Sequence, residues 1–129
     1  MDGNEQELRQ QDEGYALMGA AFEVYNELGP GFLEEVYQEA LEMVLAAQNI
    51  PFISKPRLNV WFREVKLQKH YEADLLVTDE IVVELKAVRT LTPEHEAQLL
   101  NELKITRQRI GYLINFGASP RLQWSRRVL

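Results

Sequence analysis

Residues 71–88 read YEADLLVTDEIVVELKAV, and this stretch decides the fold. Apolar side chains occupy alternate positions up to Val77 and again from Ile81 to Ala87. Alternation with a period of two predicts two β-strands, and the polar residues 78–80 (TDE) predict a short connection between them. Because several intervening positions are apolar as well, we expect both faces of the sheet to be covered.

The length of this connection decides where the acidic side chains point. With a three-residue connection, Val77 pairs with Ile81, and Asp74 lies directly opposite Glu84 on the same face of the sheet. With a two-residue turn at 79–80, Asp74 pairs with Leu85, and the two acids point to opposite faces. The hypothesis of a shared site is therefore also a prediction of strand register.

Two carboxylates on one face repel each other unless a cation lies between them. Their hard oxygen ligands suit Mg²⁺ or Mn²⁺, and Lys86, two residues after Glu84, could orient a water or contact a phosphate oxygen. Glu-x-Lys occurs three times in the chain, but only the copy at 84–86 has strand residues on both sides. A structural ion pair at the sheet edge is an equally good interpretation of the spacing alone.

Helices are expected on the N-terminal side of these strands. Residues 13–28 and 32–48 have helical apolar spacing, separated by a Gly-Pro-Gly stop at 29–31. In the second helix the apolar side runs from Met43 and Val36 round to Leu41 and Leu45. Glu34 falls between these two leucines, where a carboxylate needs a partner, a proton or a metal. Residues 1–12 are predicted to form a flexible N-terminus, which leaves 13–129 as a single domain.

On the C-terminal side, Thr92, Pro93 and Glu94 predict the start of a helix that runs to about residue 106. A strand is expected at 109–116, and 122–129 could form an edge strand. A further strand is expected around 58–62, followed by a turn or loose hairpin at 63–69. The fold class is α/β (α+β), with a mixed central sheet flanked by helices.

Composition excludes several classes of protein. The 129 residues contain no cysteine, which excludes disulfides, thiolate metal sites and thiol catalysis. The longest apolar run is five residues and the first twelve residues are polar, so we expect neither membrane insertion nor export, and a cytoplasmic location is the default. The net charge of −6 argues against tight nonspecific nucleic-acid binding, but residues 100–129 carry a net +5. Those bases could face phosphate or simply be solvated.

The chain resembles a known family in six blocks that occur in the family's order. GFLEEVY at 31–37 fits Gly-x-x-Glu-x-x-Tyr through Gly31, Glu34 and Tyr37, and it follows LGPG. The later blocks are YEADLLV, IVVELKAV, LTPEHEAQLLNELK and GYLINFG. Over about residues 14–128 the sequence is similar to the GxxExxY family of the PD-(D/E)XK nuclease-like superfamily. The resemblance implies a restriction-endonuclease-like α-β-β-β-α-β core with an extra N-terminal helix.

The resemblance also implies roles for individual residues. Asp74 and Glu84 match the metal-ligand acids, Glu34 the helix acid that completes the metal site, and Lys86 the catalytic lysine. Gln98 matches a glutamine that supports the lysine or a phosphate, although a place on the helix surface is as good an interpretation. Glu102 departs from the pattern, since an aromatic residue is common at that position. Tyr37 is expected to be a core aromatic, and His95 a solvated first-turn histidine.

These observations favour a Mg²⁺- or Mn²⁺-dependent nuclease that hydrolyses a nucleic-acid phosphodiester bond, with DNA favoured over RNA. The alternative is a catalytically silent module of the same fold that binds nucleic acid or a protein partner. A homodimer or a complex with another protein is a third possibility. No element that would recognise a base sequence is identifiable.

Overall fold

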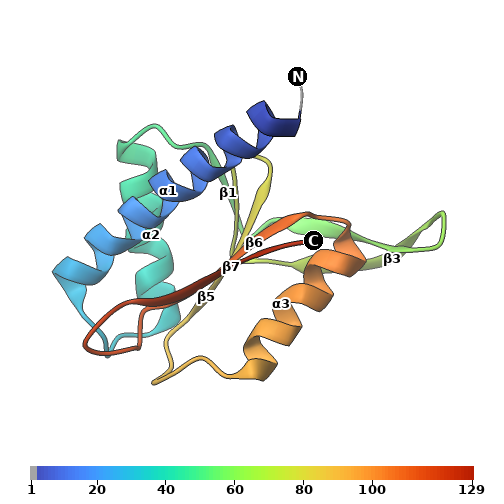
Figure 1. Ribbon diagram of the computed structural model, residues 1–129. Helices are drawn as coiled ribbons and strands as arrows, with labels where there is room; N and C mark the ends of the chain where they lie inside the picture. The colour runs from blue at the N-terminus through green and yellow to red at the C-terminus, as the bar shows by residue number, and fades with distance from the viewer. Residues whose placement is uncertain (1–2) are drawn as a thin grey trace.

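The computed structural model describes residues 3–129 of the 129-residue chain. In this part of the chain, two helices are followed by five strands, a third helix and two further strands (Figure 1). In chain order they are α1 (Gly3–Leu28), α2 (Glu34–Ala47), β1 (Phe52–Ser54), β2 (Arg57–Phe62), β3 (Val65–Glu72), β4 (Leu75–Val77), β5 (Ile81–Lys86), α3 (Pro93–Thr106), β6 (Ile110–Asn115) and β7 (Gln123–Val128). This mixed fold with helices around a central sheet confirms the predicted class.

The central sheet has five strands in the order β1-β4-β5-β6-β7. Strands β5 and β6 run parallel because α3 crosses over between them, and the other neighbours pair antiparallel. The expected edge strand near the C-terminus is confirmed as β7. The short opposite edge strand, β1, has no counterpart in the sequence predictions.

Two apolar clusters lie on the two faces of this sheet. Leu75, Val83 and Leu85 belong to the cluster that includes the buried sides of α1 and α2. Val82 and Leu113 belong to the cluster under α3. Because side chains alternate across a strand, Glu84 and Lys86 lie on the α3 face together with Val82. The alternation of β5 therefore carries the Glu-x-Lys pair to the face of the sheet that α3 covers.

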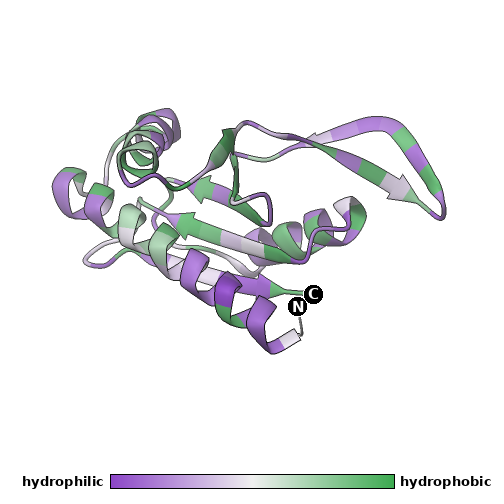
Figure 2. Ribbon diagram, turned by 90° about the horizontal axis from the view of Figure 1, so that it is seen from above, coloured by the Kyte–Doolittle hydropathy of each residue, from purple (hydrophilic) through white to green (hydrophobic). Residues whose placement is uncertain are grey.

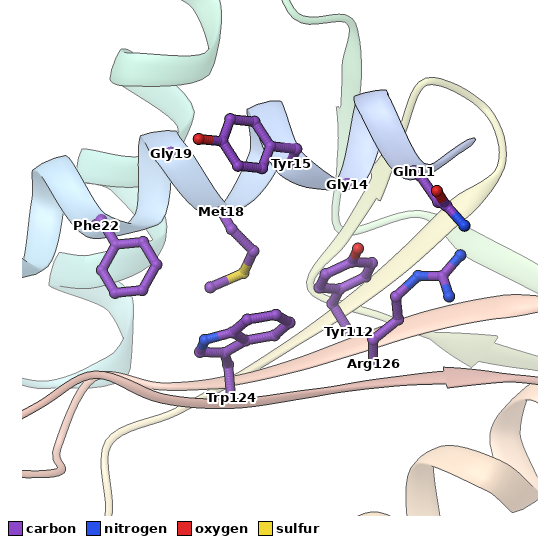
Figure 3. Close-up of a pocket in the computed structure, with 9 residues that line it drawn as sticks. All are labelled: Gln11, Gly14, Tyr15, Met18, Gly19, Phe22, Tyr112, Trp124 and Arg126. Atoms are coloured by element: carbon purple, nitrogen blue, oxygen red, sulfur yellow. The ribbon is translucent and has the colours of Figure 1, made fainter. Parts of the chain in front are cut away.

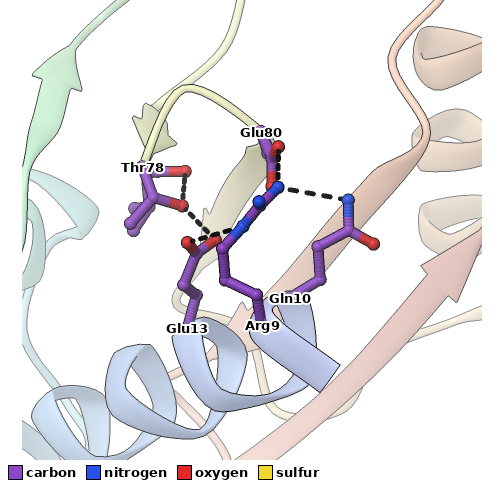
Figure 4. Close-up of polar contacts among 6 residues, drawn as sticks. Arg9, Gln10, Glu13, Thr78 and Glu80 are labelled. Carbon is purple, nitrogen blue, oxygen red and sulfur yellow. Dashed lines mark hydrogen bonds and ion pairs between the residues drawn. The ribbon is translucent and has the colours of Figure 1, made fainter. Parts of the chain in front are cut away.

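The first helix is longer than the sequence predicted. It begins at Gly3 rather than near residue 13. Side chains of its first turns contact the connection between β4 and β5: Arg9 forms an ion pair with Glu80 at 2.7 Å, and Thr78 Oγ1 donates to Glu13 at 2.8 Å (Figure 4). The flexibility expected of residues 1–12 stays a prediction for 3–12, and residues 1–2 lie outside the described part.

Helix α2 begins close to the predicted position, but its apolar stripe is narrower than expected. Val36 and Met43, assigned to the inward side, are exposed. Tyr37, Leu41 and Leu45 are buried and make the contact with the core. Ala40 and Val44 are partly buried beside them, so the buried stripe is narrow, and Glu34 is exposed to solvent.

The segment expected as a turn or loose hairpin, 63–69, is mostly strand. β2 and β3 form a two-stranded antiparallel hairpin that turns at Arg63 and Glu64, with a register shift between Asn59 and Trp61. This hairpin, here called the arm, projects from the central sheet in both views (Figures 1 and 2). The chain then breaks at Ala73 and Asp74 before β4, so the strand predicted as continuous over 71–77 serves two different sheets.

Candidate active site

The register of β4 and β5 confirms the three-residue connection. Val77 pairs with Ile81, and Leu75 pairs with Val83. One further step along the same register places Asp74, at the start of β4, opposite Glu84 on β5. Val82 packs into the α3-side cluster, so alternation along β5 assigns Glu84 to that face, and the charge of Asp74 acts on Glu84. The structure therefore has the strand register that a shared site of these two acids requires.

Both oxygens of Asp74 have partners within the chain. Oδ2 accepts a hydrogen bond from the Leu85 backbone N at 2.6 Å, and Oδ1 lies 3.3 Å from the Lys55 Nζ. The Asp74 carboxylate thus accepts a hydrogen bond from a β5 backbone N–H just beyond Leu75, where the pairing of β4 with β5 begins. Asp74 has a structural role at this position in addition to any role in binding a ligand.

Glu84 lies against Glu102, a side chain of α3. Burial, the contact with Glu102 and the charge of Asp74 raise the pKa of Glu84 well above its ordinary value, while Lys86 opposes the shift. Burial also raises the pKa of Glu102, which is only 2% exposed. Two close carboxyl groups in a site of low polarity favour sharing a proton. The Oε1 atoms of Glu84 and Glu102 have no hydrogen-bond partner.

Glu34 occupies the first turn of α2, as predicted, but it is exposed rather than turned into the core. Partial burial and the charge of Asp74 raise its pKa, and the charge of Lys86 lowers it. These effects place Glu34 in the same electrostatic neighbourhood as Asp74 and Lys86. One turn later, Gln38 is buried and its Nε2 donates to the Asp74 backbone O at 2.7 Å, which attaches α2 to the start of β4.

Tyr37, the third position of the Gly-x-x-Glu-x-x-Tyr motif, is a core residue as expected. Its side chain is fully buried and stacks on Phe116, with ring centroids 4.7 Å apart. Its hydroxyl donates to the Gly29 backbone O at 2.6 Å and accepts from the Phe32 backbone N at 3.2 Å. The motif tyrosine therefore holds the connection that places Glu34 at the start of α2.

Lys86 and Gln98 line one small cavity of about 60 Å³ between β5 and α3, together with Glu84 and Glu102. His95 lines it as well, which the sequence interpretation did not favour. The His95 side chain is half-buried. Its Nδ1 accepts a hydrogen bond from the Thr92 backbone N at 3.0 Å, which caps the N-terminus of α3. The side chains of Gln98, Lys86 and His95 thus line the same cavity as the Glu84 carboxyl.

A larger hollow of about 320 Å³ adjoins this cavity between α3 and the arm. Tyr71, Gln98 and Glu102 line both spaces. Lys69 and His70 of β3 line the larger one, and the buried Nδ1 of His70 has no hydrogen-bond partner. The site is therefore the inner end of a groove that extends along the arm.

The three acids predicted to bind a metal do not form a ligand cluster in this conformation. Within residues 3–129, no three histidine or acidic side chains are gathered closely enough to hold an ion. Asp74 contacts Lys55, Glu84 contacts Glu102, and Glu34 remains at the surface. Carboxylate oxygens are the donors that a hard divalent ion prefers, and Glu84 and Glu102 each have one such oxygen without a hydrogen-bond partner.

Glu102 is the functional-site residue that the sequence interpretation missed. It had been noted only as a departure from a family pattern. Its position three residues after Leu99 and next to Leu103 is the available signal, because those leucines face the sheet and a residue at that spacing faces it too. A carboxyl on the buried side of a helix needs a partner, and Glu84 supplies it.

The fold and the site together indicate a class of protein. The antiparallel strands β4 and β5, with β6 parallel to β5, carry acids and a lysine to a groove beside α3. A family model described as the PD-(D/E)XK nuclease superfamily matches residues 11–127. The chain belongs to this superfamily.

One solved structure with a similar fold is that of a protein named SSO0001. The resemblance covers 73% of this chain at 22% sequence identity, with a TM-score of 0.52. The chain spans 48% of the length of that protein. No match was found among curated proteins. Within residues 3–129, no helix is long and apolar enough to cross a membrane.

Proposed function

We propose that this protein is a metal-dependent nuclease of the GxxExxY type that hydrolyses a phosphodiester bond of nucleic acid, with DNA favoured over RNA. The observation that supports this most is the strand register, which puts Asp74 opposite Glu84, together with the cavity at the inner end of the groove that Glu84 and Lys86 both line. Membership of the superfamily supports the same class of activity.

In this proposal Asp74 and Glu84 hold Mg²⁺ or Mn²⁺, and Glu34 is the auxiliary acid. The ion would polarise the phosphate and lower the pKa of a bound water. Lys86 would position the attacking water and stabilise the negative charge that develops on the phosphate oxygens. Gln98, which lines the same cavity, would hold Lys86 or a phosphate oxygen in place.

The arm supplies a surface suited to a nucleic-acid backbone. It carries four exposed bases, against two acids, Glu64 and Glu72; the bases are Arg57, Arg63, Lys66 and Lys69. At its end the Arg107 guanidinium lies 5.0 Å from the centre of the Trp61 ring. Lysine and arginine side chains that neutralise phosphates dominate the nonspecific affinity of a protein for nucleic acid. The bases of the arm therefore offer a local surface for nucleic acid although the net charge of the protein is negative.

A catalytically silent module of the same fold is the second candidate. The specific observation in its favour is the pairing of Glu84 with Glu102, which occupies one proposed metal ligand with a neighbouring carboxyl. In that case the groove and arm would bind nucleic acid or a protein without hydrolysing it.

Cleavage of fluorescently labelled single- and double-stranded DNA and RNA, with Mg²⁺, Mn²⁺ or a chelator, tests the two candidates. The nuclease proposal predicts metal-dependent cleavage that is lost in Glu84→Gln while the far-UV circular dichroism is unchanged. Equal cleavage by Glu84→Gln would assign the activity to another site or to a contaminant. Salt-dependent binding without cleavage in any metal would favour the silent module.

A further inference from the structure

A hollow of about 460 Å³ lies between α1 and the outer strand β7 (Figure 3). Of the described residues that line it, Arg126 alone is charged. Tyr112, another of them, belongs to the cluster under α1, so this hollow lies on the opposite face of the sheet from Glu84. It is therefore separate from the acids that the proposed function uses, and a further side chain that acts on those acids has to come from elsewhere.

Lys55 is such a side chain. It lies in the connection between β1 and β2 and belongs to none of the sequence blocks quoted above. Its Nζ is 3.3 Å from Asp74 Oδ1, and its backbone N donates to the Asp74 backbone O at 3.0 Å. One residue therefore contacts both the side chain and the main chain of a proposed metal ligand.

The backbone at Lys55 is held in a conformation that residues with a side chain rarely adopt. Its φ is 52°, in the left-handed region, which costs free energy unless the surrounding contacts hold it. The hydrogen bond to the Asp74 O is one such contact, and the Pro56 O accepts from the Ala73 N at 3.2 Å. The connection is thus fastened to the break between β3 and β4 by main-chain bonds, which persist when the Lys55 side chain is replaced.

Lys55 also acts on Glu34, the auxiliary acid of the proposed site. Partial burial and, after it, the charge of Asp74 raise the pKa of Glu34. The charges of Lys86 and Lys55 lower it. Asp74 and Glu34 therefore repel each other, and the Lys55 ammonium is a cation that offsets this repulsion from the surface of the protein.

A divalent ion at Asp74 has to compete with this ammonium. Asp74 Oδ2 accepts from the Leu85 N, and Oδ1 is the oxygen that contacts Lys55. An ion bound to Oδ1 would lie beside the ammonium, and two cations repel. The Lys55 side chain is 50% exposed on a flexible stem, so the ammonium can turn into solvent without breaking a buried contact.

We propose that Lys55 is the resident counter-ion of the metal site: its ammonium neutralises Asp74 and Glu34 when no divalent ion is bound, and an incoming ion displaces it. This assignment rests on the proposed function, because it needs Asp74 to be a metal ligand. Lys55 then stabilises the metal-free protein and lowers its affinity for Mg²⁺. Removing its charge should therefore change stability and metal affinity in opposite directions.

Lys55→Met tests both effects, because methionine keeps much of the stem and removes the charge. In isothermal titration calorimetry with Mg²⁺ or Mn²⁺, we expect the dissociation constant to fall on the order of threefold or more. The melting temperature of the metal-free protein should fall by about 1–3 °C. Circular dichroism verifies that the variant is folded, and a purely structural role for Lys55 would not make metal binding tighter.

Two further variants separate the charge at this position from net charge. Lys55→Arg keeps a cation beside Asp74, so its metal affinity should stay close to that of the unmodified chain. Lys104→Met removes the same charge from an exposed position on α3 and should leave the metal affinity unchanged.

Unchanged or weaker metal binding by Lys55→Met would overturn the proposal, and so would equal tightening in Lys104→Met. Both results would leave the metal site itself standing. Absence of metal binding in the unmodified chain and in Lys55→Met alike would overturn the proposed function together with this inference. Binding that is detectable only in Lys55→Met would support the displacement directly.

Discussion

Glu102 of α3 lies against Glu84 of β5, so that two carboxyl groups meet in the cavity that Lys86 and Gln98 also line. The pKa of each carboxyl is raised, chiefly by burial. A proton can hold such a pair together as a cation would. The contact therefore connects the stability of the protein, its response to pH and the proposed metal binding.

The first prediction concerns metal binding. Mg²⁺ or Mn²⁺ should raise the melting temperature of the protein, and Asp74→Asn should remove this shift while preserving an acceptor for the Leu85 N–H. Differential scanning fluorimetry measures both. Asp79→Asn, at an exposed position with φ of 62°, is the matched control and should respond like the unmodified chain. An equal shift in Asp74→Asn would argue against a metal site at Asp74.

The second prediction concerns pH. Because the folded pKa values of Glu84 and Glu102 are raised above the unfolded value near 4.5, the folded protein binds more protons than the unfolded one in the interval between them. The stability from this pair is fully present below that unfolded value and is lost as pH rises through the raised pKa values. Urea denaturation at increasing pH should show the decline.

Glu102→Gln tests the origin of that decline. An amide can donate a hydrogen bond to the Glu84 carboxylate without sharing a proton, so the pKa of Glu84 should fall and the loss of stability at high pH should shrink. A pH profile that is unaltered in Glu102→Gln would show that other groups cause the decline.

The third prediction concerns Lys86. Lys86→Ala should reduce the rate of metal-dependent cleavage by about two orders of magnitude or more, because it removes a charge that stabilises the transition state. The Glu-x-Lys at 102–104 offers a matched control: Lys104 follows Glu102 at the same spacing but is exposed on α3. Lys104→Ala should cleave at the unmodified rate, and equal losses in both variants would mean that Lys86 acts only through general charge.

The fourth prediction concerns Tyr37. Tyr37→Phe keeps the stacking on Phe116 but removes the hydroxyl that joins the Gly29 O and Phe32 N. We expect the free energy of unfolding to fall by about 1–2 kcal/mol, the range for a lost buried hydrogen-bonding group. Tyr15→Phe changes an exposed hydroxyl and should have little effect. A Tyr37→Phe protein as stable as the original would show that the connection before α2 holds without this hydroxyl.

Much of the fold followed from local patterns in the sequence. Thr92 and Pro93 marked the start of α3, and the structure has the Thr92 side chain and His95 capping that helix. The alternation from Ile81 identified β5, and the polar residues 78–80 identified its connection to β4. These signals were reliable because caps, turns and alternation act over a few residues.

Other features depended on contacts between distant residues. The first strand of the arm was expected around 58–62, but most of β3 was missed because Val65 and the residues after it are mostly polar, and a strand largely exposed on both faces has no apolar alternation to detect. The start of α1 was placed too late because its first turns are fixed by Glu80, some seventy residues away, rather than by an apolar stripe. Glu102 was missed because its partner comes from another element.

The sequence by itself determined the order of most elements and the buried strand with Glu84 and Lys86, since both depend on periodicity. It left two registers open for Asp74, and the pairing of Val77 with Ile81 in the structure decided between them. Only the tertiary structure decided which charges meet: Glu84 with Glu102, Asp74 with Lys55, and Glu34 at the surface. Periodicity gives the face on which a side chain lies, but the packing of α3 against the sheet decides what stands opposite it.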